Sequence, residues 1–567
     1  MPGKPRAVAA HRLALASILA VAVVFRLWGI AWGLQNANVS RRPQPDEWAI
    51  YWLFKWFGQH HNLNPCAHGS TQCFFDWGSL YPYLAFAVHG ATTPLLALLP
   101  STTFGARANL TFVQSILAAR FLSVMVSVLT VYVVYSFGRR AYAPRVGLVA
   151  ALITALSTLL IQLAHFGTPD STTILLLYTA LLAMWWFVQE PSFWRFGLAA
   201  AAAGLAMASE YHMGLLLAPL AVSWLLAERK KVAWLALAVC ITLIAYLSIN
   251  AYALIDLQSF LAASEHTLRI RTVDSGAEYG DRWSRYGSAW LYVVRYALGY
   301  GVGVLFTAWM LAGLGWAVVR RRQAELLLLS WLVPYFLLVS LSPAKFMRYS
   351  APLVPGLAIL AAGCACAVLA DSRITVRLGT LLLAGVAVGY TAVYDSAYMG
   401  LFSSLDPRSV AAGWLTQHAP RSSAIAFEEL PNGLLNLPYF IVDEPTVDEP
   451  YPQCYARFNT GTLAGPEEYV LTDDYALEEH PGFSPHTVAQ FRNSLTSSAT
   501  YRLVKTIHEV PTFLGVQFPI DGSPHDWRYP DHVIRIYRHA SPANHASYCY
   551  PTLTAAQTAL YVPSHGS

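Results

Sequence analysis

Two neighbouring carboxylates, Asp46 and Glu47, are the residues whose types and setting most favour chemistry in this chain. They follow a Pro-x-Pro, lie beyond the first strongly apolar segment, and precede an aromatic-rich run with the pattern of a helix. Asp46 can cap this helix, because its carboxylate can accept the amide hydrogens of the first turn. Alternatively, it is an acid held where a membrane meets water, ready to accept a proton from a substrate.

Two further carboxylates interrupt or flank apolar segments. Asp170 follows Gly167-Thr168-Pro169 at the start of an apolar run, which is also a good position for a helix cap. Glu210 interrupts a run of Ala, Gly, Leu and Met. A carboxylate at membrane depth costs about 2.5–3.5 kcal/mol unless it is paired or hydrated, so Glu210 needs a partner or a function.

The composition is that of a polytopic membrane protein. Of 567 residues, 55% are hydrophobic and only 12% are charged, about half the charged fraction of a soluble protein. The net charge of +5 gives no footprint for nucleic acid. The sequence contains no Walker loop, dinucleotide fingerprint, His-Glu-x-x-His motif or nucleophile elbow. Scattered histidines such as His60-His61 lack the spacing of metal ligands.

Apolar segments of spanning length predict about eleven transmembrane helices. They lie near 13–34, 112–137, 146–164, 171–188, 196–208, 213–226, 232–253, 289–319, 325–341, 349–369 and 375–394. Basic clusters occur at alternate turns, at 138–145, 228–231, 320–322 and 373–377. The positive-inside rule places these turns and the N-terminus in the cytoplasm. Segment 80–99 is also apolar, but a crossing there would move the first basic turn outside, so we expect a juxtamembrane or re-entrant helix.

This topology gathers the candidate charges on one outer face of the membrane. They are Asp46, Glu47, Asp170, Glu210, Lys345 and Arg348. Cations on the outside run against the usual bias, so Lys345 and Arg348 indicate a local anion such as a phosphate. Arg26 lies within the first apolar run and either snorkels to the interface or faces a polar cavity.

The composition changes near residue 403, where Pro, Asp, Glu, His and Tyr become frequent and no run is long enough to span. A short helix is predicted at 409–417, and strands at 424–428, 468–472, 501–506 and 533–537. We therefore expect a mainly α protein in which residues 1–400 form the membrane domain, with a first external loop at 35–111. Residues 401–567 should form an extracytoplasmic mixed α/β domain.

Four cysteines fall in the predicted external regions. Cys66 and Cys73 lie in the first loop, and Cys454 and Cys549 in the C-terminal domain. Two disulfides, one within each pair, fit an oxidising compartment. The three remaining cysteines lie in predicted spans, where they serve as small apolar residues.

An ordered set of motifs over about 12–394 resembles the GT-C glycosyltransferases. The set comprises Pro45-Asp46-Glu47-Trp48, the segment from 118–123 to Gly138-Arg139-Arg140, Gly167-Thr168-Pro169-Asp170, the segment 204–211, and Arg348-Tyr349 followed by Pro352 and Pro355. The most similar branch is that of protein O-mannosyltransferases and bacterial aminoarabinose transferases, glycosyltransferase family 39. The sequence departs from this branch at Glu210, where a Lys is usual, and before the juxtamembrane helix, where Gly78-Ser79-Leu80-Tyr81-Pro82 lacks a cation.

The resemblance implies transfer of a sugar from a polyprenyl-phosphate carrier to a lipid, glycan or protein acceptor at the periplasmic face of the inner membrane. It makes Asp46 the catalytic carboxylate, with Asp170 as its companion. The candidate substrate-binding residues are Glu47, Glu210, Tyr211, Lys345, Arg348 and Tyr349. A divalent metal between carboxylates is possible but not required in this branch, and no other cofactor is expected.

A lipid-phosphate donor already has a good leaving group, so the reaction needs a positioned base and cations for the phosphate. Asp46 as general base would give inversion in a single displacement. The main alternative is a transporter or lipid flippase of the cell envelope, whose spans also carry intramembrane acids. The sequence shows no two-half symmetry, and a large external domain fits a transporter poorly. A scaffold role in envelope assembly is a third reading.

Overall fold

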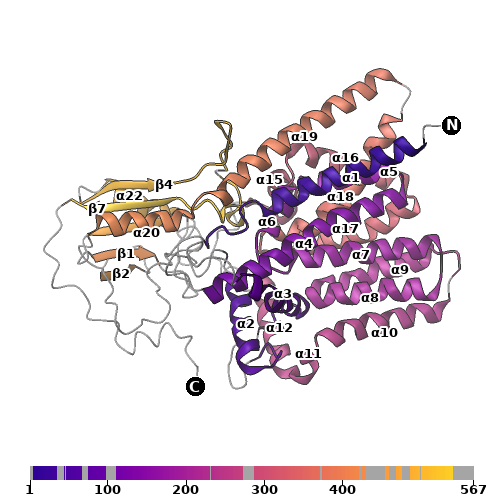
Figure 1. Ribbon diagram of the computed structural model, residues 1–567, viewed down its shortest axis with the longest axis horizontal. Helices are drawn as coiled ribbons and strands as arrows, with labels where there is room; N and C mark the ends of the chain where they lie inside the picture. The colour runs from indigo at the N-terminus through magenta and orange to yellow at the C-terminus, as the bar shows by residue number, and fades with distance from the viewer. Residues whose placement is uncertain are drawn as a thin grey trace.

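A computed structural model describes residues 4–34, 44, 46–66, 74–96, 110–229, 231–272, 286–370, 373–419, 424–428, 454–458, 468–474, 485–497, 500–520 and 522–540. It contains a bundle of long helices with a smaller sheet domain at one end (Figure 1). The N-terminus lies at the opposite end of the bundle. This architecture is mainly α with a C-terminal mixed α/β domain, as the sequence predicts.

Helices in the described residues occupy the positions of the predicted spans. The first half of the bundle contains α1 (Lys4–Leu27), α4 (Leu110–Ala141), α5 (Pro144–Ala155), α6 (Thr158–Ala164), α7 (Asp170–Gln189) and α8 (Phe193–Ser209). The second half contains η2 (Tyr211–Leu216), α9 (Leu217–Leu226), α10 (Val232–Ile249), α16 (Val304–Arg320), α17 (Gln323–Leu341), η5 (Met347–Leu353), α18 (Val354–Leu369) and α19 (Ile374–Ser403).

The length and composition of these helices identify a membrane protein. Among the described residues, seven helices are long and apolar enough to cross a membrane, or eight if the α5–α6 pair, bent by 61°, is one span. Three shorter apolar helices, α8, η2–α9 and α16, complete the set. The prediction of about eleven spans therefore includes the seven or eight long apolar helices and the three shorter ones.

The predicted span 289–319 is wrong as a single helix. The segment begins with α14 (Ala289–Tyr292), continues through a π-helical turn (η4, Val293–Leu298) and α15 (Gly299–Gly301), and breaks before α16. Gly303 has φ 87°, a conformation that glycine adopts at little cost. At Gly301 a Cβ atom would lie 2.8 Å from that of Leu159, so α15 needs glycine to approach α6. Apolar periodicity alone does not reveal such a break.

Arg26 also departs from both interpretations of its sequence position. Its side chain is fully buried and donates hydrogen bonds to Ser127 Oγ at 2.7 Å and to the carbonyl oxygens of Ala155 at 3.1 Å and Thr154 at 3.3 Å. The last carbonyls of a helix lack intrahelical partners, and the α5–α6 bend exposes them inside the protein. Arg26 therefore neither snorkels to the interface nor faces an open cavity. It donates hydrogen bonds to the carbonyl oxygens at the α5–α6 bend.

Shorter helices lie between the bundle and the sheet domain. They are α2 (Glu47–His60), α3 (Leu80–Leu96), α11 (Tyr252–Ile255) and α12 (Leu257–Thr272). In Figure 1, α2 runs across the direction of the long helices at the end that faces the sheet domain. Tyr81 of α3 is buried and donates a hydrogen bond to the carbonyl oxygen of Ala119 in α4. Segment 80–96 is thus a helix packed on α4, and it does not appear among the candidate spans.

The turns of the bundle form two sets. We call the end with the turn residues 139–145, 227–229, 231, 320–322, 370 and 373 the basic end, and the end with the turns at 28–34, 165–169, 209–212 and 342–348 the site end. At the basic end, Gln323 Nε2 donates to the carbonyl oxygen of Leu226. At the site end, His165 Nε2 lies 2.7 Å from the carbonyl oxygen of Trp28. The four basic clusters and the six candidate charges are therefore at opposite ends of the helices.

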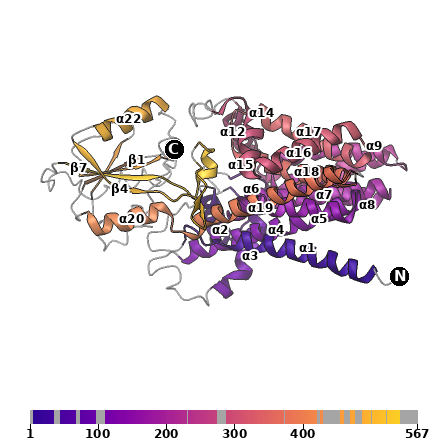
Figure 2. The ribbon, with the colours of Figure 1, turned by 90° about the horizontal axis from the view of Figure 1, so that it is seen from above.

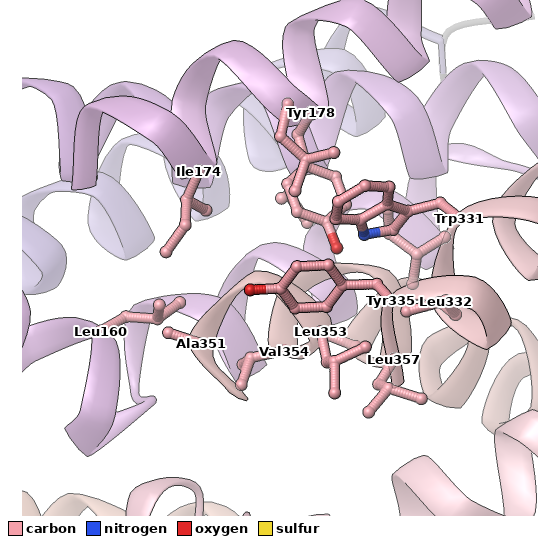
Figure 3. Packing of buried hydrophobic residues seen from close by; sticks show 14 of the residues in the cluster. Leu160, Ile174, Tyr178, Trp331, Leu332, Tyr335, Ala351, Leu353, Val354 and Leu357 are labelled. Carbon is pink, nitrogen blue, oxygen red and sulfur yellow. The ribbon is translucent and has the colours of Figure 1, made fainter. Parts of the chain in front are cut away.

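The centre of the bundle is apolar and closely packed. Tyr178 is the main polar group in this part of the core, and its hydroxyl donates to the carbonyl oxygen of Pro352 and accepts from the Gly356 amide. Figure 3 shows the rings of Tyr178, Trp331 and Tyr335 gathered near Leu353, Val354 and Leu357. A buried hydroxyl with both roles satisfied costs little, and its two bonds hold α7 against η5 and the start of α18.

The C-terminal domain is built on a five-stranded sheet of order β2-β1-β3-β7-β4. Its strands are β1 (Ala424–Glu428), β2 (Cys454–Phe458), β3 (Tyr469–Asp473), β4 (Tyr501–Ile507) and β7 (Ile534–His539), with a separate hairpin of β5 (Thr512–Phe513) and β6 (Val516–Gln517). Strands β1, β2 and β3 are parallel, and β7 pairs antiparallel with β3 and β4. Helices α20 (Pro407–His418) and α22 (Pro485–Ser497) cover opposite faces of the sheet (Figure 2).

Of the four cysteines in the two predicted disulfides, the structure describes the side chain of Cys66 alone. Cys66 is disulfide-bonded. The predicted partner Cys73 lies outside the described residues, as do Cys549 and the side chain of Cys454. The cysteines expected within spans, Cys240, Cys364 and Cys366, are free thiols.

Candidate active site

Asp46 lies at the N-cap position of α2, but its side chain makes no capping hydrogen bond. Its carboxylate instead forms an ion pair with Arg348 of η5, which is 302 residues away in sequence. Gln44 Nε2 lies 3.4 Å from the same carboxylate oxygen. The side chains of Asp46 and Arg348 keep 28% and 20% of their surface exposed, so the pair is open to a ligand. The interpretation of Asp46 as a cap is therefore wrong.

Asp170 joins this pair from a third element. It is the first residue of α7, where Pro169 holds the N-cap position, and its Oδ2 accepts a hydrogen bond from Thr168 Oγ1 at 2.7 Å. The charges of Arg348 and Asp46 both act on its carboxylate. We refer to Asp46, Asp170 and Arg348 as the acid–arginine cluster. The cluster therefore brings two carboxyl groups close to one guanidinium.

Glu47 has a different environment from its neighbour Asp46. Its side chain is fully buried, and its two oxygens accept hydrogen bonds from Arg120 Nε at 2.7 Å and Nη2 at 2.8 Å. The Gly167 amide donates to the same carboxylate at 2.7 Å. Arg120 in turn donates to the carbonyl oxygens of Ile30 and Trp32. Glu47 thus ties together the start of α2, helix α4 and the α6–α7 turn.

Glu210 belongs to a second polar chain at the site end. Its carboxylate lies 3.2 Å from His212 Nε2, and the Tyr335 hydroxyl lies 3.4 Å from that nitrogen. Tyr335 donates its hydroxyl hydrogen to the carbonyl oxygen of Tyr349, next to Arg348. This chain connects Glu210 to the backbone that carries the arginine.

Tyr211 points into the juxtamembrane region. Its hydroxyl donates to the carbonyl oxygen of Trp77 at 2.7 Å, and its ring packs edge-on against Tyr246 and Phe260. These contacts hold the segment before α3 against α10 and α12.

Lys345 and Tyr349 flank Arg348 in the segment that enters η5. The guanidinium of Arg348 lies 5.1 Å from the ring centroid of Phe346 and 5.7 Å from that of Tyr349, within range of cation–π attraction. Partial burial lowers the pKa of Lys345. The segment therefore presents one arginine held by aromatic rings and one lysine whose charge is partly desolvated.

Sequence reasoning missed Asp526, which reaches the site from the C-terminal domain. It lies in η7 (His525–Arg528), and its Oδ2 accepts a hydrogen bond from the Met347 amide at 2.7 Å. Burial raises the pKa of Asp526 to about 7, and the positive charge of Arg348 opposes this rise. Nothing in the local sequence marks this aspartate, because only the tertiary fold brings it beside Arg348.

Within the described ranges, no group of three or more His, Cys, Asp or Glu side chains could hold a metal ion. Asp46 and Asp170 share a cation in Arg348 instead. The arrangement can accept a proton on a carboxylate and bind an anion through a guanidinium.

The fold and this site define a polytopic membrane protein with a charged cluster at one end of its helices. Residues 106–249 match the family described as dolichyl-phosphate-mannose-protein mannosyltransferase. The matched segment runs from α4 to α10 and contains Arg120, Asp170 and Glu210. The match confirms the resemblance to GT-C glycosyltransferases that the sequence motifs indicate. A search of curated proteins finds no significant match.

Solved structures of two kinds are similar to this chain. ArnT from Cupriavidus metallidurans in the apo state has 14% identity and a TM-score of 0.48, over 94% of this chain and 98% of that one. The same protein bound to undecaprenyl phosphate has 15% identity and a TM-score of 0.47, over 92% and 97%.

The archaeal oligosaccharyltransferase AglB from Archaeoglobus fulgidus, in complex with an inhibitory peptide and a dolichol-phosphate, has 12% identity and a TM-score of 0.47, over 73% of this chain. This chain spans only 62% of the length of AglB. Because all three TM-scores are below 0.5, the functional assignment rests on the family match and on the geometry of the acid–arginine cluster.

Proposed function

We propose that the protein is a membrane glycosyltransferase that moves a sugar from a polyprenyl-phosphate-linked donor to an acceptor. One observation carries the proposal: the partly exposed ion pair of Asp46 and Arg348 beside Asp170, in a chain whose segment 106–249 matches a mannosyltransferase family. The pair combines a base with a cation for a phosphate, which are the two groups that this transfer needs.

In the proposed reaction, an acceptor hydroxyl attacks the anomeric carbon of the lipid-linked sugar. Asp46 takes the hydroxyl proton as the new carbon–oxygen bond forms. The bond between the anomeric carbon and the phosphate oxygen breaks, and its electron pair leaves with the lipid phosphate. Arg348 stabilises the charge on that phosphate. The single displacement inverts the anomeric configuration.

The Asp46–Arg348 ion pair suggests an order of events. While Asp46 pairs with Arg348, its Oδ2 is occupied by the guanidinium and is not free to contact the acceptor hydroxyl. A donor phosphate competes for the same guanidinium, and its arrival releases Asp46 towards the acceptor. Donor binding therefore precedes activation of the base.

The neighbouring residues take supporting roles. Asp170 can orient the acceptor hydroxyl, and Lys345 and Tyr349 lie beside the phosphate-binding arginine. Glu210 contacts the site through His212 and Tyr335. Glu47 does not bind substrate in this proposal, because both of its oxygens are occupied in a buried ion pair. It positions Asp46, and Tyr211 positions the juxtamembrane segment.

The charges at the two ends of the bundle support one orientation in the membrane. The four basic clusters lie at the basic end, and the positive-inside rule assigns that end to the cytoplasm. The site end and the sheet domain then face the periplasm of a bacterial inner membrane. The donor lipid reaches the cluster from the bilayer, and the sugar is a hexose or pentose. Since Arg348 supplies the cation, the proposed transfer does not require a divalent metal.

The orientation has its own test, which uses single cysteines added to a chain whose free thiols have been replaced. A cysteine at exposed Leu514 of the sheet domain should react with a membrane-impermeant maleimide in intact cells, and one at exposed Val319 of the basic end should not. The reverse labelling pattern would contradict the assignment.

The test of the function uses the full-length protein in nanodiscs with a radiolabelled polyprenyl-phosphate sugar. Wild type should release the sugar from the donor and Asp46→Asn should not. Glu190→Gln, which changes an exposed carboxylate paired with Arg195 far from the cluster, serves as the matched control. Movement of the intact donor across the bilayer without cleavage would support the flippase alternative and contradict the proposal.

A further inference from the structure

We propose that Asp526 of the sheet domain is a positioning residue that fixes Arg348 for binding the lipid phosphate. This inference rests on the proposed function in one respect, namely that Arg348 receives the donor phosphate. It gives the C-terminal domain a direct part in the site.

The segment that carries Asp526 is inserted into the bundle. We call residues 522–532 the docking segment. Within it Trp527 is fully buried, stacks on Tyr398 of α19 at 4.5 Å, and donates its Nε1 hydrogen to the Tyr394 hydroxyl. The Tyr398 hydroxyl donates to the Trp527 carbonyl oxygen at 2.7 Å, and Gln162 Nε2 of α6 donates to the Asp526 carbonyl oxygen at 2.9 Å. The backbone of the docking segment is therefore held from two helices.

The Asp526 carboxylate acts on the residue directly before Arg348. Its side chain is 4% exposed, and its Oδ2 accepts from the amide of Met347, the first residue of η5. Amides at the start of a helix have no partner within the helix, and a carboxylate acceptor makes a charge-assisted bond to them. The bond fixes the backbone from which the Arg348 side chain departs towards Asp46. The backbone amide of Arg348 also acts on this carboxylate, while Oδ1 makes no hydrogen bond to the described residues.

Other titratable groups also face this carboxylate. Arg348 approaches from η5, Tyr398 approaches from α19, and His525 precedes Asp526 in the docking segment itself. Burial raises the pKa of Asp526 to about 7. The carboxylate is therefore ionised above about pH 7 and protonated below it. Donor binding by wild type should weaken as the pH falls through this value.

The first experiment measures binding of undecaprenyl phosphate to the full-length protein in detergent at about pH 8. Asp526→Asn keeps an oxygen acceptor but loses the charge, and we expect its Kd to rise roughly tenfold, as for loss of a charge-assisted hydrogen bond. Asp531→Asn is the matched control. Asp531 is equally buried in the docking segment but contacts His508 of the sheet domain at 3.3 Å, so its variant should bind as wild type does.

The second experiment separates positioning from a merely structural role. In steady-state transfer, Asp526→Asn should raise the donor KM with a much smaller change in kcat. The donor KM of wild type should rise between pH 8 and pH 6, and that of Asp526→Asn should stay nearly constant. A sugar-phosphate diester donor is used, because its phosphate does not titrate in this range.

Unchanged or tighter binding of undecaprenyl phosphate by Asp526→Asn would overturn the inference, since tighter binding would mean that the carboxylate merely repels the phosphate. If Asp526→Asn does not fold, a wild-type donor KM that is flat between pH 6 and pH 8 overturns it instead. If wild type binds the lipid and Asp526→Asn weakens binding, but no sugar is released, the proposed function fails and this inference stands. If Asp46→Asn abolishes transfer and Asp526→Asn has no effect on binding or KM, the proposed function stands and this inference fails.

Discussion

An arginine meets a carboxylate at each end of the helical bundle, and the two pairs differ in what surrounds them. At the site end, Arg348 and Asp46 both remain partly exposed, and Asp170 adds a second acid. At the basic end, Arg320 Nε lies 3.6 Å from Glu325, whose side chain is fully buried in the first turn of α17. Arg320 also lies over the ring of Trp316 at 4.6 Å.

The difference separates a pair that can exchange partners from one that fixes a helix start. A negative side chain in the first turn stabilises a helix by complementing its dipole, which accounts for Glu325 without any ligand. At the site end, Asp46 stands at a helix start and does not cap it. Arginine–carboxylate pairs are thus common to both ends, and at the site end a partly exposed pair lies beside a second carboxyl group, that of Asp170.

The largest expected effect follows from removal of the base. Asp46→Asn should lower kcat by roughly 10²–10⁴-fold, the usual contribution of a general base. The unfolding midpoint in detergent should remain close to that of wild type, because the partly exposed carboxylate contributes little to stability. Sugar release by single-turnover kinetics is the measurement. If the Asp46→Asn variant retained a tenth of the wild-type kcat, Asp46 would not be the general base.

The residue next to Asp46 should behave in the opposite way. Glu47→Gln leaves Arg120 charged and buried without its counter-charge, which costs about 3–5 kcal/mol in comparable sites. The unfolding midpoint should fall clearly, and any loss of activity should follow the loss of folded protein. The double variant Glu47→Gln/Arg120→Met should recover part of this stability. Full stability of Glu47→Gln alone would contradict the role of Glu47 as an anchor.

A smaller effect is expected when lysine replaces Arg348, because the positive charge is kept but the planar guanidinium is lost. Arg348→Lys should raise the donor KM by roughly ten- to a hundredfold, because a lysine cannot bind a phosphate in the bidentate way. The kcat at saturating donor should change less than KM. Lys345→Gln is the comparison within the same segment, and its KM should change less than that of Arg348→Lys. Equal KM values for the two variants would mean that general positive charge, rather than Arg348, binds the donor.

The sequence predicts the helices of this protein well because long apolar segments and basic turns carry strong signals. The strands predicted at 424–428 and 501–506 also agree with β1 and β4 to within a residue. In contrast, the sequence analysis predicts neither β2 nor α22, although α22 is amphipathic. The break before α16 occurs at Gly303, and apolar periodicity does not reveal the positive φ of this residue.

The candidate site is only partly predictable from the sequence. Asp46, Asp170 and Arg348 are recognisable because charges at the ends of apolar segments are rare. Their roles depend on partners that lie far away in sequence, such as the 302 residues between Asp46 and Arg348. Asp46 and Glu47 look alike in the sequence, and their different partners, Arg348 and Arg120, distinguish them. Asp526 lies in a polar domain where aspartates are ordinary.

The smallest effect is expected at the basic end. Glu325→Gln removes the carboxylate from a pair whose arginine is 26% exposed, so Arg320 can turn to water. The cost should be about 1 kcal/mol or less, from the helix dipole and a weak ion pair. Transfer at saturating donor should stay within about twofold of wild type, since Glu325 stands at the end of the helices that does not carry the acid–arginine cluster. Because Arg348 and Arg320 both pair with an acid at a helix start, a large loss of transfer in Glu325→Gln would show that the two ends are coupled, and that exposure does not distinguish the functional pair.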